Sequence, residues 1–122
     1  MIPDYWVRFV KAHDPLAKEI RIPEEADMSQ VGADFQMMTA EDCLNEATNF
    51  WPGIGVTKDG YVPVAECLIG SGDPYFINSN DGEGGPLYRI YHDSVSEEGY
   101  DTEVAVAIVL RSYEQVLSYV AT

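Results

Sequence analysis

Apolar and polar residues alternate along the middle of the chain in the way that half-buried β-strands require. The alternation is regular over residues 87–92, where one face carries Leu87, Arg89 and Tyr91 and the other carries Tyr88, Ile90 and His92. Two more strand-like runs, Tyr61 to Ile69 and Tyr75 to Ile77, precede it, and clusters of Gly, Asn, Asp and Pro separate the runs. The sequence therefore predicts an antiparallel β-meander over residues 60–92.

Helical spacing occurs on both sides of this meander. The segment Asp4 to His13 predicts a short helix with Asp4 as its N-cap. A second helix begins at Thr39, pairs Thr39 with Asp42 in a capping-box pattern, and ends near Phe50. Its apolar residues recur three or four positions apart, which places them on one face: Cys43, Leu44, Ala47 and Phe50. Ser112 with Gln115 forms a second capping-box pattern, and Val116, Leu117 and Val120 then line one face of a terminal helix.

Other segments are less regular. Residues 35–38 fit a short strand. The segment Glu19 to Val31 follows no clear pattern: Pro23 interrupts it, and the acids Glu24, Glu25 and Asp27 indicate a solvated stretch. Pro63 indicates an edge strand or a bulge in its run. The valine-rich run Val104 to Leu110 fits a strand or a buried helix, and periodicity does not decide between them. The predicted class is α+β, an antiparallel sheet packed with helices from the N- and C-terminal parts.

The composition fits one domain over residues 1–122, because domains cluster near ~100–150 residues. The chain has seven Lys and Arg residues and 21 Asp and Glu residues, which gives a net charge of −14. Residues 1–58 hold ten acids and five bases, and residues 59–122 hold eleven acids with only Arg89 and Arg111. Such a chain repels phosphate backbones and anionic membranes, so we expect no direct nucleic-acid or membrane binding. The excess favours a basic partner, or solubility through self-repulsion.

Location and cysteine chemistry follow from the same composition. The N-terminal segment lacks the features of a signal peptide, and no window has the ~18–20 apolar residues of a membrane span. Cys43 and Cys67 are too few and too far apart for a disulfide framework or a zinc site, and they read as buried small hydrophobes. We expect a cytoplasmic protein.

No pattern in the chain indicates an enzyme or a cofactor. His92 lies beside Asp93, but adjacent strand residues point to opposite faces, so a strand-end role is favoured over a catalytic base. Ser71 is not in a nucleophile elbow, and the loop after Ile77 fails the register of a calcium-binding loop. A small hydrolase using acids around His92 remains the least favoured alternative; His92→Ala and Asp93→Asn would then abolish its activity.

Four motifs, in order, resemble those of the SUKH superfamily, which includes fungal cell-wall-assembly regulators and many bacterial immunity proteins. They are GYVPVAE (60–66), GSGDPYFI (70–77), GPLY (85–88) followed by YHD (91–93), and LRSYEQVL (110–117). The resemblance covers residues 60–117, and the first 58 residues carry none of the usual motifs. It implies a SUKH-like α+β binding domain without catalytic activity.

Bacterial members of this family commonly bind and neutralise a toxin domain, often a nuclease. The resemblance thus implies an immunity protein, and the acidic charge suits a basic toxin domain as its partner. A regulatory or scaffolding domain of the same fold that binds another cellular protein is the alternative. Self-pairing through a valine-rich edge at Val104 to Val109 is opposed by the net charge.

The predicted contact residues belong to the acidic segment between the last two apolar runs. Carboxylates would contact the partner and a tyrosine, a favoured residue at binding hot spots, would anchor it. The residues are Asp93, Glu97, Glu98, Tyr100, Asp101 and Glu103.

Overall fold

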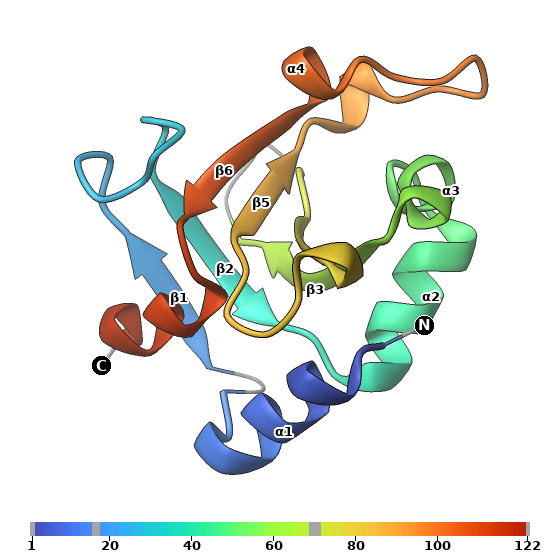
Figure 1. Cartoon of the computed structure of the whole chain (residues 1–122). Helices are drawn as coiled ribbons and strands as arrows, with labels where there is room; N and C mark the ends of the chain where they lie inside the picture. Colours follow the sequence, from blue (N-terminus) through green and yellow to red (C-terminus); the bar gives the residue numbers. More distant parts are fainter. Residues whose placement is uncertain (1, 16–17, 69–71, 122) are drawn as a thin grey trace.

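The computed structural model describes residues 2–15, 18–68 and 72–121, and it confirms the α+β class. The described strands form one six-stranded antiparallel sheet in the order β1-β2-β3-β4-β5-β6, so each strand pairs with the next along the chain. The predicted meander is thus the centre of a longer one (Figure 1). The strands are β1 (Glu19–Ile22), β2 (Ala33–Met37), β3 (Tyr61–Cys67), β4 (Tyr75–Asn78), β5 (Leu87–Ile90) and β6 (Val106–Leu110).

The helices lie at the ends of the chain and between strands. The predicted helices at Asp4 to His13 and after Thr39 are confirmed as α1 and α2, and the terminal one is the 3-10 helix η4. In η4, Val116 is buried, but Leu117 is exposed and Val120 lies just past the end of the helix. Shorter helical turns connect the strands. The α-helices are α1 (Asp4–His13), α2 (Ala40–Asn49), α3 (Gly53–Val56) and α4 (Thr102–Ala105). The 3-10 helices are η1 (Thr57–Asp59), η2 (Ser79–Asp81), η3 (His92–Ser94) and η4 (Tyr113–Tyr119).

The capping predictions have mixed outcomes. The Thr39 hydroxyl accepts the backbone N–H of Asp42 at 3.2 Å, and the capping box of Ser112 with Gln115 is formed in both directions. Asp4 is wrong as an N-cap: Pro3 occupies that position, and Asp4 lies inside the first turn of α1. On α2, Cys43 and Ala47 are buried as predicted, but Leu44 and Phe50 are exposed because only part of that face meets the sheet.

Long-range pairing decides two segments that the sequence left open. Residues 19–22 form β1, which pairs with β2 from Glu19–Gln36 to Ile22–Ala33. For Pro63, the edge strand is wrong because β3 pairs with both β2 and β4, and the bulge is confirmed by the register shift between Pro63 and Ala65. Ile69 and the turn residues 70 and 71 lie outside the described residues.

The run 104–110 contains both of the structures that the sequence allowed. Its first residues complete α4, and β6 then continues to Leu110. The change occurs at Val106, where the backbone becomes extended and begins to pair with Ile90 of β5. The acidic segment that precedes residue 104 therefore ends next to β6, an edge strand of the sheet.

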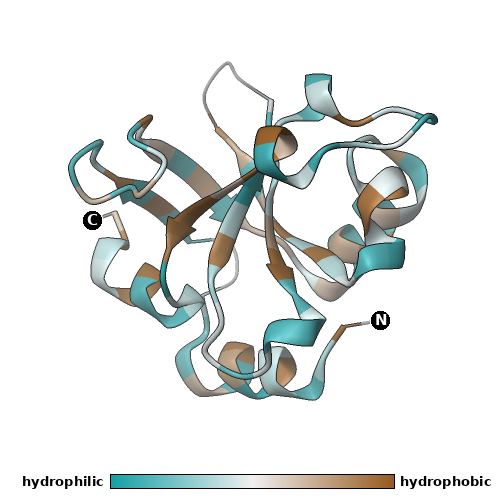
Figure 2. Ribbon diagram, turned by 45° about the horizontal axis from the view of Figure 1, so that its top comes forward, coloured by the Kyte–Doolittle hydropathy of each residue, from teal (hydrophilic) through white to brown (hydrophobic). Residues whose placement is uncertain are grey.

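The two faces of the sheet bury separate apolar clusters among the described residues. On one face, α1 and η4 contribute Trp6, Phe9, Tyr113 and Val116 to the larger cluster. On the other face, Val56 of α3 meets a smaller cluster that contains Tyr61, Phe76, Ile90, Val95 and Ala105. The alternation along β4 explains the division, because Tyr75 and Ile77 belong to the larger cluster and Phe76 to the smaller one. Figure 2 shows β6 as a largely hydrophobic strand.

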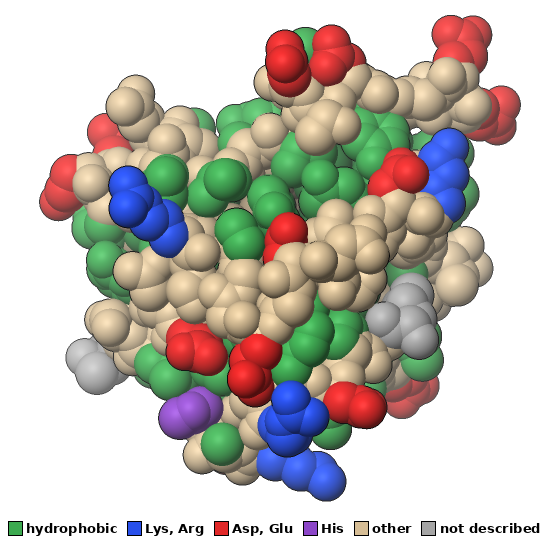
Figure 3. Space-filling model, in the orientation of Figure 1, with side chains coloured by type: hydrophobic (Ala, Val, Ile, Leu, Met, Phe, Trp, Pro, Cys, Tyr) green, Lys and Arg blue, Asp and Glu red, His purple; other side chains and the backbone are tan. Residues whose placement is uncertain are grey.

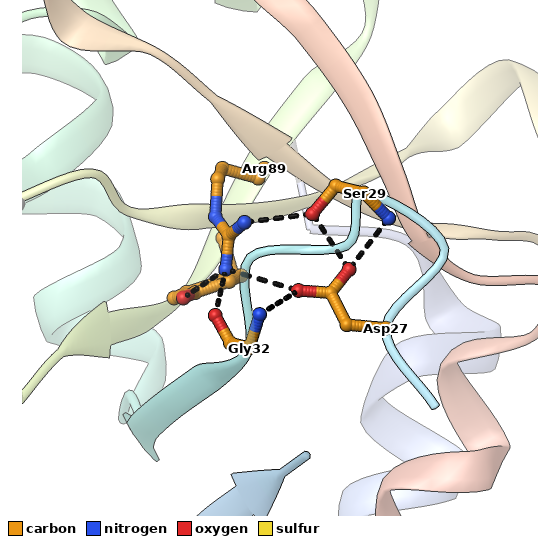
Figure 4. A network of polar contacts seen from close by, with 5 residues as sticks. Asp27, Ser29, Gly32 and Arg89 are labelled. Atoms are coloured by element: carbon orange, nitrogen blue, oxygen red, sulfur yellow. Dashed lines mark hydrogen bonds and ion pairs between the residues drawn. The ribbon is translucent and has the colours of Figure 1, made fainter. Parts of the chain in front are cut away.

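A buried ion pair connects the 23–32 loop to the sheet (Figure 4). The Arg89 side chain is 3 % exposed, and its Nη2 lies 3.4 Å from Oδ2 of Asp27, whose side chain is fully buried. Arg89 also donates to the Ser29 hydroxyl and the Gly32 carbonyl, each at 2.7 Å, and to the Tyr75 hydroxyl at 3.0 Å. The acidic stretch that the sequence places in solvent therefore holds one of the most buried carboxylates of the chain.

Candidate functional site

The acidic arm, residues 93–103, leaves the sheet after β5 and returns as α4 (Figure 1). Val95 buries its side chain in the smaller cluster and fixes the base of the arm. The tip is a tight turn, in which the N–H of Gly99 donates to the Ser96 carbonyl at 3.0 Å and the N–H of Ser96 donates back at 3.2 Å. Glu97 and Glu98 lie at this tip and are exposed.

The other predicted carboxylates lie at the two ends of the arm. Asp93 belongs to η3, and its side chain is 90 % exposed. Asp101 is the N-cap of α4 and accepts the backbone N–H of Glu103 at 3.0 Å. Asp101 and Glu103 are both exposed, so every predicted carboxylate of the arm is accessible to a partner.

Tyr100, the predicted anchor, is only partly exposed. Its ring packs against the smaller cluster and is half-buried, and its hydroxyl donates to Oδ2 of Asp59 at 2.6 Å. Burial and this hydrogen bond raise the pKa of Tyr100 above its ordinary value, so the phenol keeps its proton. The side chain therefore fastens the arm to η1, and a contact with a partner would use its exposed edge.

An open hollow lies between the arm and the start of β3. Its volume is about 470 Å³, and it is lined by Lys58, Asp59, Tyr61, Asn78, Gly99, Tyr100 and Thr102. The Asp59 carbonyl accepts the side-chain amides of Asn78 and Asn80 at 3.2 and 3.3 Å, so the η1 wall of the hollow is rigidly held. The sequence does not indicate this wall, because Lys58, Asp59 and Gly60 have only the composition of a turn and Asp59 is 41 residues from Tyr100.

Acidic side chains are distributed beyond the arm. On the face shown in Figure 3 they occur in several separate groups, one at α4 and another at the end of the arm. The arm is therefore one acid-rich projection on a generally acidic surface, and a partner would distinguish it by its shape as well as its charge.

His92 connects the base of the arm to the loop before β4. Its Nδ1 lies 2.5 Å from Oδ1 of Asp73, and its Nε2 lies 3.1 Å from Oδ1 of Asp93. The expectation that His92 and Asp93 point apart is wrong, because residues 92–94 form a 3-10 turn instead of continuing the strand. Both ring nitrogens contact carboxylates, an arrangement that fixes the start of the arm.

The cysteines and other chemical features add no further site. Cys43 is buried, and burial raises the pKa of its thiol to about 12, while Cys67 is half-buried. Within residues 2–15, 18–68 and 72–121, no three His, Cys, Asp or Glu side chains converge as a metal site would require. None of the helices in those ranges has the length and apolar character to cross a bilayer.

Comparison with known proteins found no matching family model, curated protein or solved structure.

The hydrogen bond between Tyr100 and Asp59 provides a test of how the arm is held. Tyr100→Phe keeps the ring packing and removes the donor, and we expect about 1 kcal/mol of local stability to be lost. Amide hydrogen exchange at residues 96–100 should then be about fivefold faster. Tyr119→Phe, a half-buried tyrosine of η4, is the matched control and should leave exchange in the arm unchanged. Equal exchange in the Tyr100→Phe variant and the original protein would contradict this role.

Proposed function

We propose that the chain is a non-enzymatic protein-binding domain of the immunity type, which neutralises a basic toxin domain by binding it through the acidic arm. The arm carries the proposal, because residues 93–103 hold five carboxylates without a lysine or arginine and project from the sheet (Figure 1). A toxin that acts on nucleic acid needs a cationic groove for phosphate. A projecting anionic segment fits such a groove and would occupy its phosphate positions.

The arrangement of the arm also supports fast association. Long-range attraction between a negative protein and a cationic groove steers the encounter and raises association rates by about 10–10³-fold at low salt. The anchors at Val95, Tyr100 and His92 hold the arm in place before binding, which reduces the entropy that binding would otherwise lose. The hollow beside the arm offers a recess for a side chain of the partner.

The test removes negative charges from the arm by substitutions that keep its shape. The variant carries Glu97→Gln, Glu98→Gln, Asp101→Asn and Glu103→Gln, in which asparagine keeps the cap of α4. Its association rate with the product of the adjacent upstream gene should fall by about tenfold at low salt, with a weaker dependence on salt. Stopped-flow binding measures the rate, and a growth-rescue assay reports neutralisation of the toxin.

A control variant separates the arm from total charge. Asp4→Asn, Asp14→Asn, Glu41→Gln and Glu66→Gln also remove four exposed carboxylates, none of them in the arm. This variant should change the rate by less than about twofold. Equal losses in the two variants, or a neighbouring gene product that is neither basic nor bound, would count against the proposal; capture of an ordinary cellular protein through the arm would instead favour a regulatory role.

A further inference from the structure

The outer edge of β6 exposes backbone groups that are arranged to pair with another strand. The N–H of Tyr91 donates to the Ala105 carbonyl at 2.8 Å, and the same register pairs Arg89 with Ala107. In an antiparallel pair, alternate residues direct both backbone groups toward the partner strand and the residues between them direct theirs away. Val106 and Ile108 therefore point their N–H and C=O groups away from β5.

The two edge strands of the sheet, β1 and β6, differ in how far other segments cover their outer sides. At β1, the C-terminal segment covers the edge through the Ile20–Val120 bridge and the bond from the N–H of Ala121 to the Glu19 carbonyl. At β6, the N–H of Met28 reaches the Val109 carbonyl at 2.9 Å and covers only the end of the strand. The outward N–H of Val106 donates to the Thr102 carbonyl and closes α4. No described backbone group pairs with the Val106 carbonyl or with the N–H and C=O of Ile108.

The side chains along this edge also lack the usual protection. Val104 is 62 % exposed and Ile108 is 39 % exposed. Natural edge strands commonly carry a lysine or proline that blocks pairing, and residues 104–110 contain neither. Figure 3 shows hydrophobic side chains over β6 with acidic side chains beside them at α4.

The negative charge of the chain determines which kind of strand could pair with the edge of β6. A second copy would bring together two chains of net charge −14, each with Asp101 and Glu103 immediately before the exposed edge. We propose that β6 adds an extended, basic strand of a partner protein as the next strand of the sheet. The apolar side chains of that strand would cover Ile108 and Val104, and its lysines or arginines would meet the carboxylates of the arm. This inference rests on the proposed function and names how the partner binds.

The first test uses a short peptide that alternates valine and lysine, together with a matched valine–glutamate peptide. The basic peptide should slow amide exchange at Ile108 by about tenfold, because its outward N–H becomes bonded. The acidic peptide should leave exchange at Ile108 unchanged. Fast exchange at Ile108 with the basic peptide present would overturn the proposal without requiring any substitution.

The second test places a charge on the edge. Ile108→Lys keeps the backbone donors but repels a basic strand, and it should weaken binding of the basic peptide about tenfold or more. Val7→Lys is the matched control, since Val7 is 41 % exposed on α1 and the charge change is identical. Equal affinities for the two variants would overturn the proposal.

Binding of the variants to the toxin-domain partner shows whether this inference, the proposed function, or both have failed. If neutralising the arm slows binding but Ile108→Lys binds as well as Val7→Lys, the proposed function stands and pairing at β6 is wrong. If neither change affects partner binding, both are wrong. Sedimentation at high salt tests the other occupant: a dimer that Ile108→Lys abolishes would assign the edge to a second copy and overturn pairing with a basic strand.

Discussion

Replacing Arg89 by methionine is expected to lower the free energy of unfolding by about 3–5 kcal/mol, because it leaves the buried Asp27 carboxylate without its cation. Burial of the guanidinium opposes its charged form, but the contacts with Tyr75 and Asp27 outweigh burial and raise the pKa of Arg89. The Arg89 guanidinium therefore stays charged throughout the pH range in which the protein would be studied. Urea unfolding, followed by circular dichroism, measures the loss.

Two further variants show whether the loss comes from the unpaired charge. Arg21→Met breaks ion pairs with Glu19 and Asp34, but the Arg21 side chain is largely exposed, so its loss should stay below about 1 kcal/mol. Asp27→Asn should destabilise the original protein, yet stabilise the Arg89→Met variant, because it removes the carboxylate that has lost its partner. If Asp27→Asn destabilises both backgrounds equally, the two side chains are not energetically coupled.

The ion pair between Arg89 and Asp27 also supports the loop that covers the end of β6. The Asp27 carboxylate accepts the N–H groups of Ser29 and Gly32 at 2.7 and 2.9 Å, which shapes the loop that carries Met28 to Val109 of β6. Loss of Arg89 would therefore release the cover that the 23–32 loop gives to the end of β6. The buried ion pair and the proposed binding edge are in this way connected through one loop.

The predictable part of the fold is the part that local rules determine. Alternation identified β5, an apolar run between turn residues identified β4, and capping at Thr39 and Ser112 located the starts of α2 and η4. β1 was missed because four residues before Pro23 carry a weak local signal, and its stability comes from β2 and from Ala121, which lies about a hundred residues further along. Pairing between distant segments is not encoded in any short window of sequence.

Asp27 and Asp59 show the same limit for side chains. In the sequence, Asp27 follows Glu24 and Glu25 and resembles a solvated residue, and its burial depends on Arg89, 62 positions later. The alternation of β5 did contain a signal, since it placed Arg89 on one face between Leu87 and Tyr91. An arginine on an apolar face needs a buried partner, but the sequence offers 21 carboxylates and does not say which one. The acidic arm was visible as a charge run, whereas its attachment to Asp59 required the folded chain.

Gly53→Ala is expected to cause the second large loss of stability, about 2–3 kcal/mol, through a clash between two backbones. A Cβ atom at this position would lie 2.4 Å from the carbonyl oxygen of Glu46 and 3.0 Å from the Cα of Ala47. Neither atom belongs to a flexible side chain, so α3 would have to move away from α2. Because Val56 of α3 is buried in the smaller cluster, that movement would also disturb the packing beneath the arm.

The effect of Gly53→Ala should extend from the core to the candidate site. The movement of α3 would displace η1, and with it the Asp59 carboxylate that holds Tyr100, so exchange at the arm amides should rise together with the global loss. Ile54→Ala is the control: Ile54 lies on the same helix α3 and is 39 % exposed, so the substitution introduces no backbone clash and should cost about 1 kcal/mol or less. If Ile54→Ala destabilised the protein as much as Gly53→Ala, or if the arm amides did not respond to Gly53→Ala, close contact of α2 with α3 would not be what positions the wall of the hollow.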